Sequence, residues 1–296
     1  MYILSMKWFL TGVRFLKRTC ALLSILLLIS SAACKKGEDR TEDVMRVAVS
    51  IYPVYSILES VAGERVEAFY VVPEGANPHT FEPDPGTVQK LYSADIYIGI
   101  TKNFDGWVER YLPVTAQIHY LADEKDNNPH IWLSLKRAAD IAAKITDALV
   151  AVDQKNRIYY SENLERFQAE INTTGQKIAA LFSNVKSRKF IQWHPAWNYF
   201  AAEYGLEIIG TIQSGHGDSP TVKEFRDLVV SAKASGAGFI VIGLRTRSSA
   251  ANALAKEIGG RVLRLDTMGG PGIIERSTYL SMMYNNAEKL SRELNR

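Results

Sequence analysis

A stretch of about 30 residues in the middle of the chain has the apolar periodicity of one uninterrupted helix. Between residues 154 and 184 no proline occurs, and six apolar side chains share one helical face: Tyr160, Leu164, Phe167, Ile171, Ile178 and Leu181. At 1.5 Å per residue, such a helix would extend roughly 45 Å. This is longer than a typical helix in a globular core, so we expect it to link two lobes.

Short β-rich runs alternate with helical segments on both sides of this predicted helix. The strands expected before it are 46–52, 66–72, 95–100 and 118–121. Those expected after it are 190–193, 207–212, 239–242 and 262–265, followed by a last helix near 272–294. This alternation is typical of parallel sheets covered by helices, so we predict an α/β protein with two such lobes.

The first 33 residues have the pattern of an export signal. Four basic residues precede a mostly apolar run of 13 residues, Ala21 to Ala33, whereas a membrane-spanning helix needs about 20. Ser31-Ala32-Ala33-Cys34 resembles a bacterial lipobox, in which the cysteine becomes the lipidated first residue. We therefore expect an exported protein, anchored to the cell envelope by lipid on Cys34; a plain signal peptide is the alternative.

These patterns divide the chain into five expected segments. They are a cleaved lipoprotein signal (1–33), a flexible tether (34–44), an N-terminal α/β lobe (45–153), the linking helix (154–185) and a C-terminal α/β lobe (186–296). Removing the signal changes the formal count from 35 Lys and Arg against 32 Asp and Glu to 31 against 32. The remaining chain is nearly neutral and gives no support for nucleic-acid binding.

Cysteine content narrows the kinds of site that the exported part can hold. The two cysteines of the chain are Cys20, inside the signal, and Cys34, at the expected cleavage site. Disulfides, cysteine-based zinc sites and cysteine nucleophiles are therefore excluded from the folded body. A metal site there has to use His, Asp and Glu.

Four potential metal ligands follow predicted strands. His79 comes after the second strand, His130 after the fourth, and His194 and Asp266 come directly after strands of the second half. Open parallel sheets bind ligands beyond the carboxyl ends of their strands, so the four side chains could converge between the lobes. Three imidazoles and one carboxylate suit tetrahedral Zn²⁺. Their gaps of 51, 64 and 72 residues match no local metal motif, so ordinary structural histidines stay an alternative on spacing alone.

Four longer motifs occur in the order found in one known family. They are Pro78-His79-Thr80-Phe81-Glu82-Pro83, Asn128-Pro129-His130-Ile131-Trp132, His194-Pro195-Ala196-Trp197 and Leu265-Asp266 before Gly269. From about Val47 to the C-terminus, the chain resembles the zinc- and manganese-binding solute receptors of ABC importers, the cluster A-I lipoproteins. The second motif usually begins with Asp, and the His-rich loop of many zinc-specific relatives has no counterpart between His79 and His130.

The resemblance implies both a fold and a function. The fold would be two lobes, each with a mainly parallel four-stranded sheet, joined by one long backbone helix, with the metal between them. His79, His130, His194 and Asp266 would bind Zn²⁺, with Mn²⁺ or Fe²⁺ as alternatives. Manganese-preferring relatives generally carry Glu at the third position, so His194 favours zinc. The chain would be a monomer without catalytic activity that passes its ion to a membrane permease.

Other residues have weaker assignments. Glu82 could orient a ligand or brace its loop; Trp132, Trp193 and Trp197 are expected to pack around the site. His119 is expected to be an ordinary strand or surface histidine. His216 could lie at the mouth of the cleft, and the acidic residues of 123–126 are expected to be solvated. An exported mono-zinc hydrolase, with Asp266 as a base, is the alternative function, and a second role as an adhesin stays open.

Overall fold

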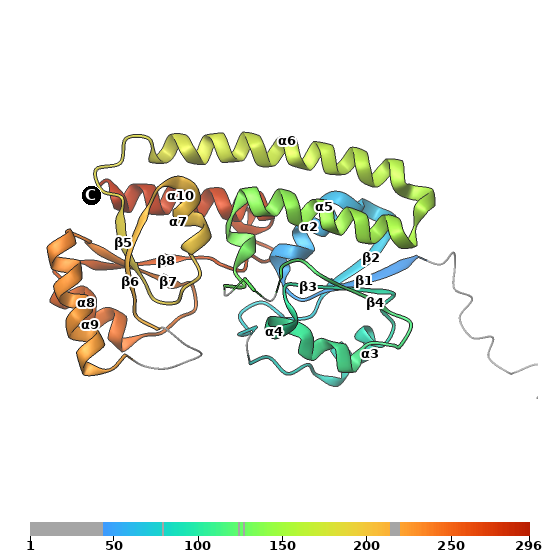
Figure 1. Ribbon diagram of the computed structural model, residues 1–296, viewed down its shortest axis with the longest axis horizontal. Coiled ribbons are helices and arrows are strands. Elements are labelled where there is room, and N and C mark those ends of the chain that lie inside the picture. Colours follow the sequence, from blue (N-terminus) through green and yellow to red (C-terminus); the bar gives the residue numbers. More distant parts are fainter. Residues whose placement is uncertain (1–43, 79, 124, 127, 214–219) are drawn as a thin grey trace, which may run out of the picture. The chain divides into compact units, whose positions relative to one another are not determined.

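Two parallel β-sheets organise residues 44–78, 80–123, 125–126, 128–213 and 220–296, which are the residues that the computed structural model describes (Figure 1). The first sheet has the order β2-β1-β3-β4 and contains β1 (Met45–Val49), β2 (Val66–Tyr70), β3 (Ile96–Gly99) and β4 (Gln117–Tyr120). The second has the order β6-β5-β7-β8 and contains β5 (Lys189–Gln192), β6 (Glu207–Thr211), β7 (Phe239–Gly243) and β8 (Arg261–Leu265).

The helices follow the strands in alternation. In the first half they are α2 (Tyr52–Ala62), α3 (Pro85–Leu91), α4 (Lys102–Asp105) and α5 (Leu135–Val152). In the second half they are α7 (Asn198–Tyr204), α8 (Val222–Ser235), α9 (Ser249–Glu257) and α10 (Tyr279–Leu294). The central strands β1 and β3 are almost wholly buried, as expected for parallel strands that helices cover on both faces.

Helix α6 (Arg157–Phe182) joins the two lobes as one helix of 26 residues. It runs along α5 and α2 in the first half and along α10 in the second (Figure 1). The main hydrophobic core lies beneath it and includes Ile57 from α2, Ile178 from α6 and Leu290 from α10. The two sheets therefore share one hydrophobic core through this helical layer. Each sheet also has a smaller hydrophobic cluster on its opposite face.

Local signals explain where several helices begin and end. The Ser134 side chain accepts a hydrogen bond from the backbone N of Arg137, which makes Ser134 the N-cap of α5. Thr221 and Glu224 form a capping box at the start of α8. Gly205 ends α7 with a φ of 64°, a left-handed conformation that favours glycine.

The predicted fold class is confirmed, with two parallel four-stranded sheets and one long helix between them. One element boundary was wrong. The last helix was expected to begin near Gly272, but α10 begins at Tyr279, with Thr278 as its N-cap. Gly269 and Gly272 have φ values of 66° and 87°, so this segment is a loop, with a single 3₁₀ turn at Ile274–Arg276, rather than the first turn of α10. Within the described part of the chain, no helix has both the length and the apolar character required to cross a bilayer.

Candidate metal centre

A cavity of about 490 Å³ opens at the carboxyl ends of the strands and is lined by residues from both halves of the chain. The first half contributes the segment after β2, Phe104 and the segment around His130. The second half contributes the end of β7 and the segments after β5, β6, β7 and β8. His130, His194 and Asp266 all line it. This is the position at which open parallel sheets bind ligands, and it joins three of the four side chains singled out by the sequence.

His130 is oriented by the residue two positions before it. The side-chain oxygen of Asn128 lies 3.0 Å from the backbone N of His130 and 2.7 Å from its ring Nδ1. Because a backbone N–H can only donate, this atom of Asn128 is the oxygen, so Nδ1 of His130 donates to it. In the neutral ring Nε2 then carries the lone pair, which is the arrangement of a histidine that coordinates a metal through Nε2. His130 itself is buried, 6% exposed.

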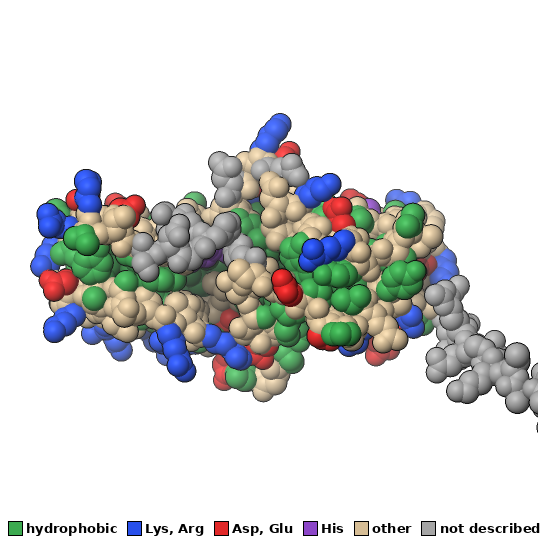
Figure 2. All heavy atoms as spheres, turned by 90° about the horizontal axis from the view of Figure 1, so that it is seen from below, with side chains coloured by type: hydrophobic (Ala, Val, Ile, Leu, Met, Phe, Trp, Pro, Cys, Tyr) green, Lys and Arg blue, Asp and Glu red, His purple; other side chains and the backbone are tan. Residues whose placement is uncertain are grey.

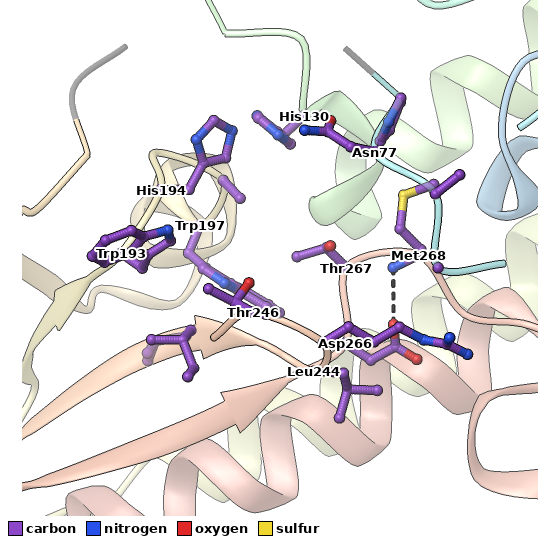
Figure 3. Close-up of a pocket in the computed structure, with 18 of the residues that line it drawn as sticks. Asn77, His130, Trp193, His194, Trp197, Leu244, Thr246, Asp266, Thr267 and Met268 are labelled. Atoms are coloured by element: carbon purple, nitrogen blue, oxygen red, sulfur yellow. Dashed lines mark hydrogen bonds between the residues drawn. The ribbon is translucent and has the colours of Figure 1, made fainter. Parts of the chain in front are cut away.

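His194 reaches the same region from the second lobe. It follows β5, and its ring centroid lies 4.9 Å from that of His130, with the two rings nearly perpendicular. Figure 3 shows the two imidazoles together at one side of the pocket. The loops that carry them are tied directly, because the Asn128 side-chain amide donates to the Pro195 carbonyl at 2.7 Å. Two of the expected ligands, 64 residues apart in sequence, are thus neighbours in space.

Asp266 follows β8 and lies across the pocket from the two histidines (Figure 3). One carboxylate oxygen, Oδ1, accepts hydrogen bonds from the backbone N of Met268 and of Gly269, both at 3.0 Å. The other, Oδ2, accepts one from Nε of Arg276 at 2.5 Å. The Asn286 side chain contacts both the backbone N and the backbone O of Asp266. The Asp266 carboxylate is therefore fixed in place, and its negative charge is paired with the positive charge of Arg276.

The sequence analysis missed two arginines that line the cavity, Arg245 and Arg276, and the carboxylate that pairs with them. Glu74, in the loop after β2, pairs with both Arg276 and Arg245 from the second lobe. The hydrogen bonds from Arg276 and Arg245 lower the pKa of Glu74. The space-filling view shows this face hollowed near its middle, with charges of both signs at the edge (Figure 2). Glu74 follows a predicted strand, a signal that could have marked it; Arg276 carries no comparable local signal.

Three tryptophans line the cavity, as predicted. Trp132 and Trp197 are buried, and Trp193 is partly buried. The indole N–H of Trp132 donates to the carbonyl of Thr267 at 2.7 Å, and its ring lies 5.2 Å from that of His130. Trp132 therefore links the segment that carries His130 to the residue next to Asp266.

Several residues of the sequence analysis lie outside the described part of the chain: His79, His216, Glu124 and Cys34. Among the residues that are described, no three His, Asp or Glu side chains are grouped closely enough to hold a metal ion. Glu82 is exposed and is not among the residues that line the cavity. His119 lies on β4, the edge strand of the first sheet, and is not among the residues that line the cavity. Burial lowers the pKa of His119. Asp126 forms an ion pair with Arg137 at 3.2 Å.

The chain is similar to known metal-binding proteins. The zinc-binding lipoprotein AdcA of Streptococcus pneumoniae is 24% identical over 93% of this chain, which spans 60% of that relative's length. The high-affinity zinc uptake system protein ZnuA of Bacillus subtilis is 23% identical, with 97% of this chain and 98% of that protein covered. A crystal structure of ZnuA superposes with a TM-score of 0.77 and 28% identity, covering 85% of this chain and all (100%) of that one.

A family model described as zinc-uptake complex component A, periplasmic (ZnuA), matches residues 47–293. The match begins in β1 and ends in α10, so it includes both sheets and the long helix between them. It also confirms the resemblance carried by the four sequence motifs. The chain therefore belongs to the ZnuA family of metal-binding components of ABC importers.

Proposed function

We propose that this protein is an extracytoplasmic solute-binding protein that captures one Zn²⁺ ion in the cavity and delivers it to the permease of an ABC importer. The observation that carries the proposal is the pair of imidazoles, His130 and His194, which come from opposite lobes to within 4.9 Å between ring centroids. Two histidines brought together in a cavity lined by both lobes suit an ion that is enclosed when the lobes close on it.

The proposed ligands are His79, His130, His194 and Asp266. The tautomer of His130 supports this assignment, since Asn128 holds Nδ1 and leaves Nε2 as the coordinating nitrogen. Asp266 lines the same cavity but is paired with Arg276, so we propose that it joins the ion as the lobes close. Neutral imidazoles with one carboxylate would replace the water shell of a divalent cation and leave the site with one net positive charge.

Zinc is the proposed cargo because the donor set is rich in nitrogen. Imidazole is a softer donor than carboxylate, and affinity for a nitrogen site rises from Mn²⁺ and Fe²⁺ to Zn²⁺. The relatives AdcA and ZnuA are named for zinc binding and zinc uptake. Competition of Mn²⁺ and Fe²⁺ with Zn²⁺ for the site tests this proposed preference for zinc.

Delivery to a permease requires the protein to stay near the membrane. We propose that it does so as a monomer anchored by lipid on Cys34, with residues 34–44 as a tether between the anchor and the folded body. The relative AdcA is named a lipoprotein, which supports this arrangement. Mass spectrometry of the exported protein tests it: a diacylated Cys34 at the new N-terminus is expected, and an unmodified cysteine there would contradict the anchor.

The test of the function is calorimetric titration of the metal-free exported protein with Zn²⁺. We expect about one ion per chain, and affinity lower by roughly 100-fold or more in His130→Ala and His194→Ala, because each removes a ligand. His119→Ala is the matched control, since His119 lies on β4 and outside the cavity lining. Absence of tight binding, or equal affinities in all four proteins, would overturn the proposal.

Two further measurements separate a receptor from the alternative hydrolase. Bound zinc should raise the unfolding temperature of the protein, because the ion binds the folded state. Zinc-loaded protein should show no turnover of ester, peptide or phosphate substrates. Zinc-dependent turnover that disappears in His130→Ala would favour the hydrolase instead.

A further inference from the structure

The positively charged guanidinium of Arg276 forms an ion pair with the carboxylate of Asp266. Its Nε donates to Oδ2 of Asp266 at 2.5 Å, while its two other nitrogens contact Glu74 and the carbonyl of Gly269. The side chains of Arg276 and Asp266 are only 13% and 10% exposed, so little water screens the pair. The Asp266 carboxylate is thus already paired with a positive charge of the protein itself, the guanidinium of Arg276.

Asp266 does not depend on Arg276 for its position. Oδ1 of Asp266 is held by two backbone N–H groups, those of Met268 and Gly269. The Asn286 side chain accepts from the backbone N of Asp266 and donates to its carbonyl, at 2.8 and 2.6 Å. With the main chain and one oxygen fixed in this way, the effect of Arg276 on Asp266 is mainly electrostatic.

Arg276 also has a second carboxylate within reach. Glu74 accepts from Arg276 and, at 3.0 Å, from Arg245. Glu74 belongs to the first lobe, in the loop after β2, whereas both arginines belong to the second. If the Asp266 carboxylate turns to a bound cation, the guanidinium can stay paired with Glu74, so its charge is not left alone in a partly buried site.

We propose that Arg276 is a competing counter-cation of the metal site, which pairs with the Asp266 carboxylate while no ion is bound and stays paired with Glu74 alone when the ion arrives. This inference rests on the proposed function. Arg276 makes binding an exchange of one cation for another on Asp266, which weakens affinity and speeds release of the ion. Glu74 makes the exchange possible, because it stays paired with Arg276 after Asp266 has turned to the ion.

The experiment compares four variants with the wild-type exported protein. Arg276→Gln removes the competing charge, Arg276→Lys keeps it without the planar fork, and Glu74→Gln removes the second acceptor. Arg261→Gln is the matched control, because Arg261 lies at the opposite end of β8 and pairs with Glu293. For each protein we measure zinc affinity by competition with a chelator, the rate of zinc release into excess chelator, and the unfolding temperature without metal.

Arg276→Gln should bind zinc at least about tenfold more tightly and release it more slowly, because a positive charge next to a ligand is lost. The same variant should unfold at a lower temperature without metal, since its Asp266 has lost an ion-pair partner. Arg276→Lys should stay within about threefold of wild type, and Glu74→Gln should bind zinc more weakly. Arg261→Gln should leave affinity unchanged.

In Arg276→Gln, zinc affinity should rise while metal-free stability falls, and these opposite changes distinguish competition from a structural role. A residue that only supports the fold would lower both metal-free stability and affinity when replaced, and the Lys variant would not restore wild-type binding. Equal or weaker zinc binding by Arg276→Gln overturns this inference while leaving the receptor assignment intact. Absence of zinc binding by wild type overturns the proposed function itself, so the two failures are distinct.

Discussion

The side-chain oxygen of Asn128 accepts two hydrogen bonds from His130, one from the backbone N at 3.0 Å and one from ring Nδ1 at 2.7 Å. The amide nitrogen of the same side chain donates to the carbonyl of Pro195, next to His194. One side chain therefore sets the tautomer of the first histidine and joins its loop to the loop of the second. The neutral amide can make both contacts because its oxygen accepts and its nitrogen donates.

Asn128→Ala should weaken zinc binding by about 10- to 100-fold, because a ligand histidine that loses its hydrogen-bond partner also loses its fixed tautomer and orientation. Titration of the metal-free protein measures the effect. Asn156→Ala is the matched control: Asn156 donates to Asp153 before α6, where no expected ligand lies. Unchanged affinity in Asn128→Ala would show that His130 needs no such support.

The buried carboxyl of Asp105 predicts a specific dependence of stability on pH. Asp105 is 1% exposed, and burial raises its pKa from 3.8 to about 7, although the backbone N–H of Ile100 donates to it at 2.6 Å. Between about pH 4 and pH 7, the folded state therefore holds a proton that the unfolded chain has released. The free energy of unfolding contributed by this group falls as pH rises through that window and is constant above it.

Asp105→Asn should remove this slope while keeping an oxygen for the N–H of Ile100. From urea unfolding of metal-free protein at pH 5 and pH 8, we expect wild type to lose on the order of 1–3 kcal/mol relative to the variant. Parallel pH curves for the two proteins would mean that Asp105 is ionised throughout this range.

The shared core beneath α6 predicts unequal effects of two isoleucines on the same helix. Ile178 is fully buried, whereas Ile158 is 74% exposed. Ile178→Ala should lower the free energy of unfolding by about 2–5 kcal/mol, because it leaves a cavity in the core that both lobes share. Ile158→Ala should change it by less than about 0.5 kcal/mol. Chemical unfolding followed by circular dichroism and by fluorescence measures both, and similar losses would contradict the packing of α6.

Most of the fold was predictable because its signals are local. The apolar stripe of 154–184 predicted α6 to within a few residues at each end. The start of α5 also depends on a local contact, because its N-cap Ser134 accepts a hydrogen bond from a residue only three positions away. The start of α10 was missed because apolar periodicity says little about glycine backbone angles. Gly269 and Gly272 adopt positive φ there, which delays the helix until Thr278 can cap it.

The candidate site was predictable only in part. Strand ends pointed to His130, His194 and Asp266, and all three line one cavity. Nothing in the order of residues linked Arg276 to Glu74, since 202 positions separate them and an ion pair has no sequence period. For the same reason, the charge already held by Asp266 could not be foreseen.

The sequence by itself determined the α/β class, the long linking helix, the absence of thiols from the folded body and the residue types available to bind a cation. These properties follow from composition and from patterns within a few turns of the chain. Only the tertiary structure decided which groups meet: the rings of His130 and His194, the Asn128 amide and the Pro195 carbonyl, and the charges of Asp266 and Arg276. Such contacts depend on how two lobes pack around one helix, a global balance of burial and charge that no local pattern encodes.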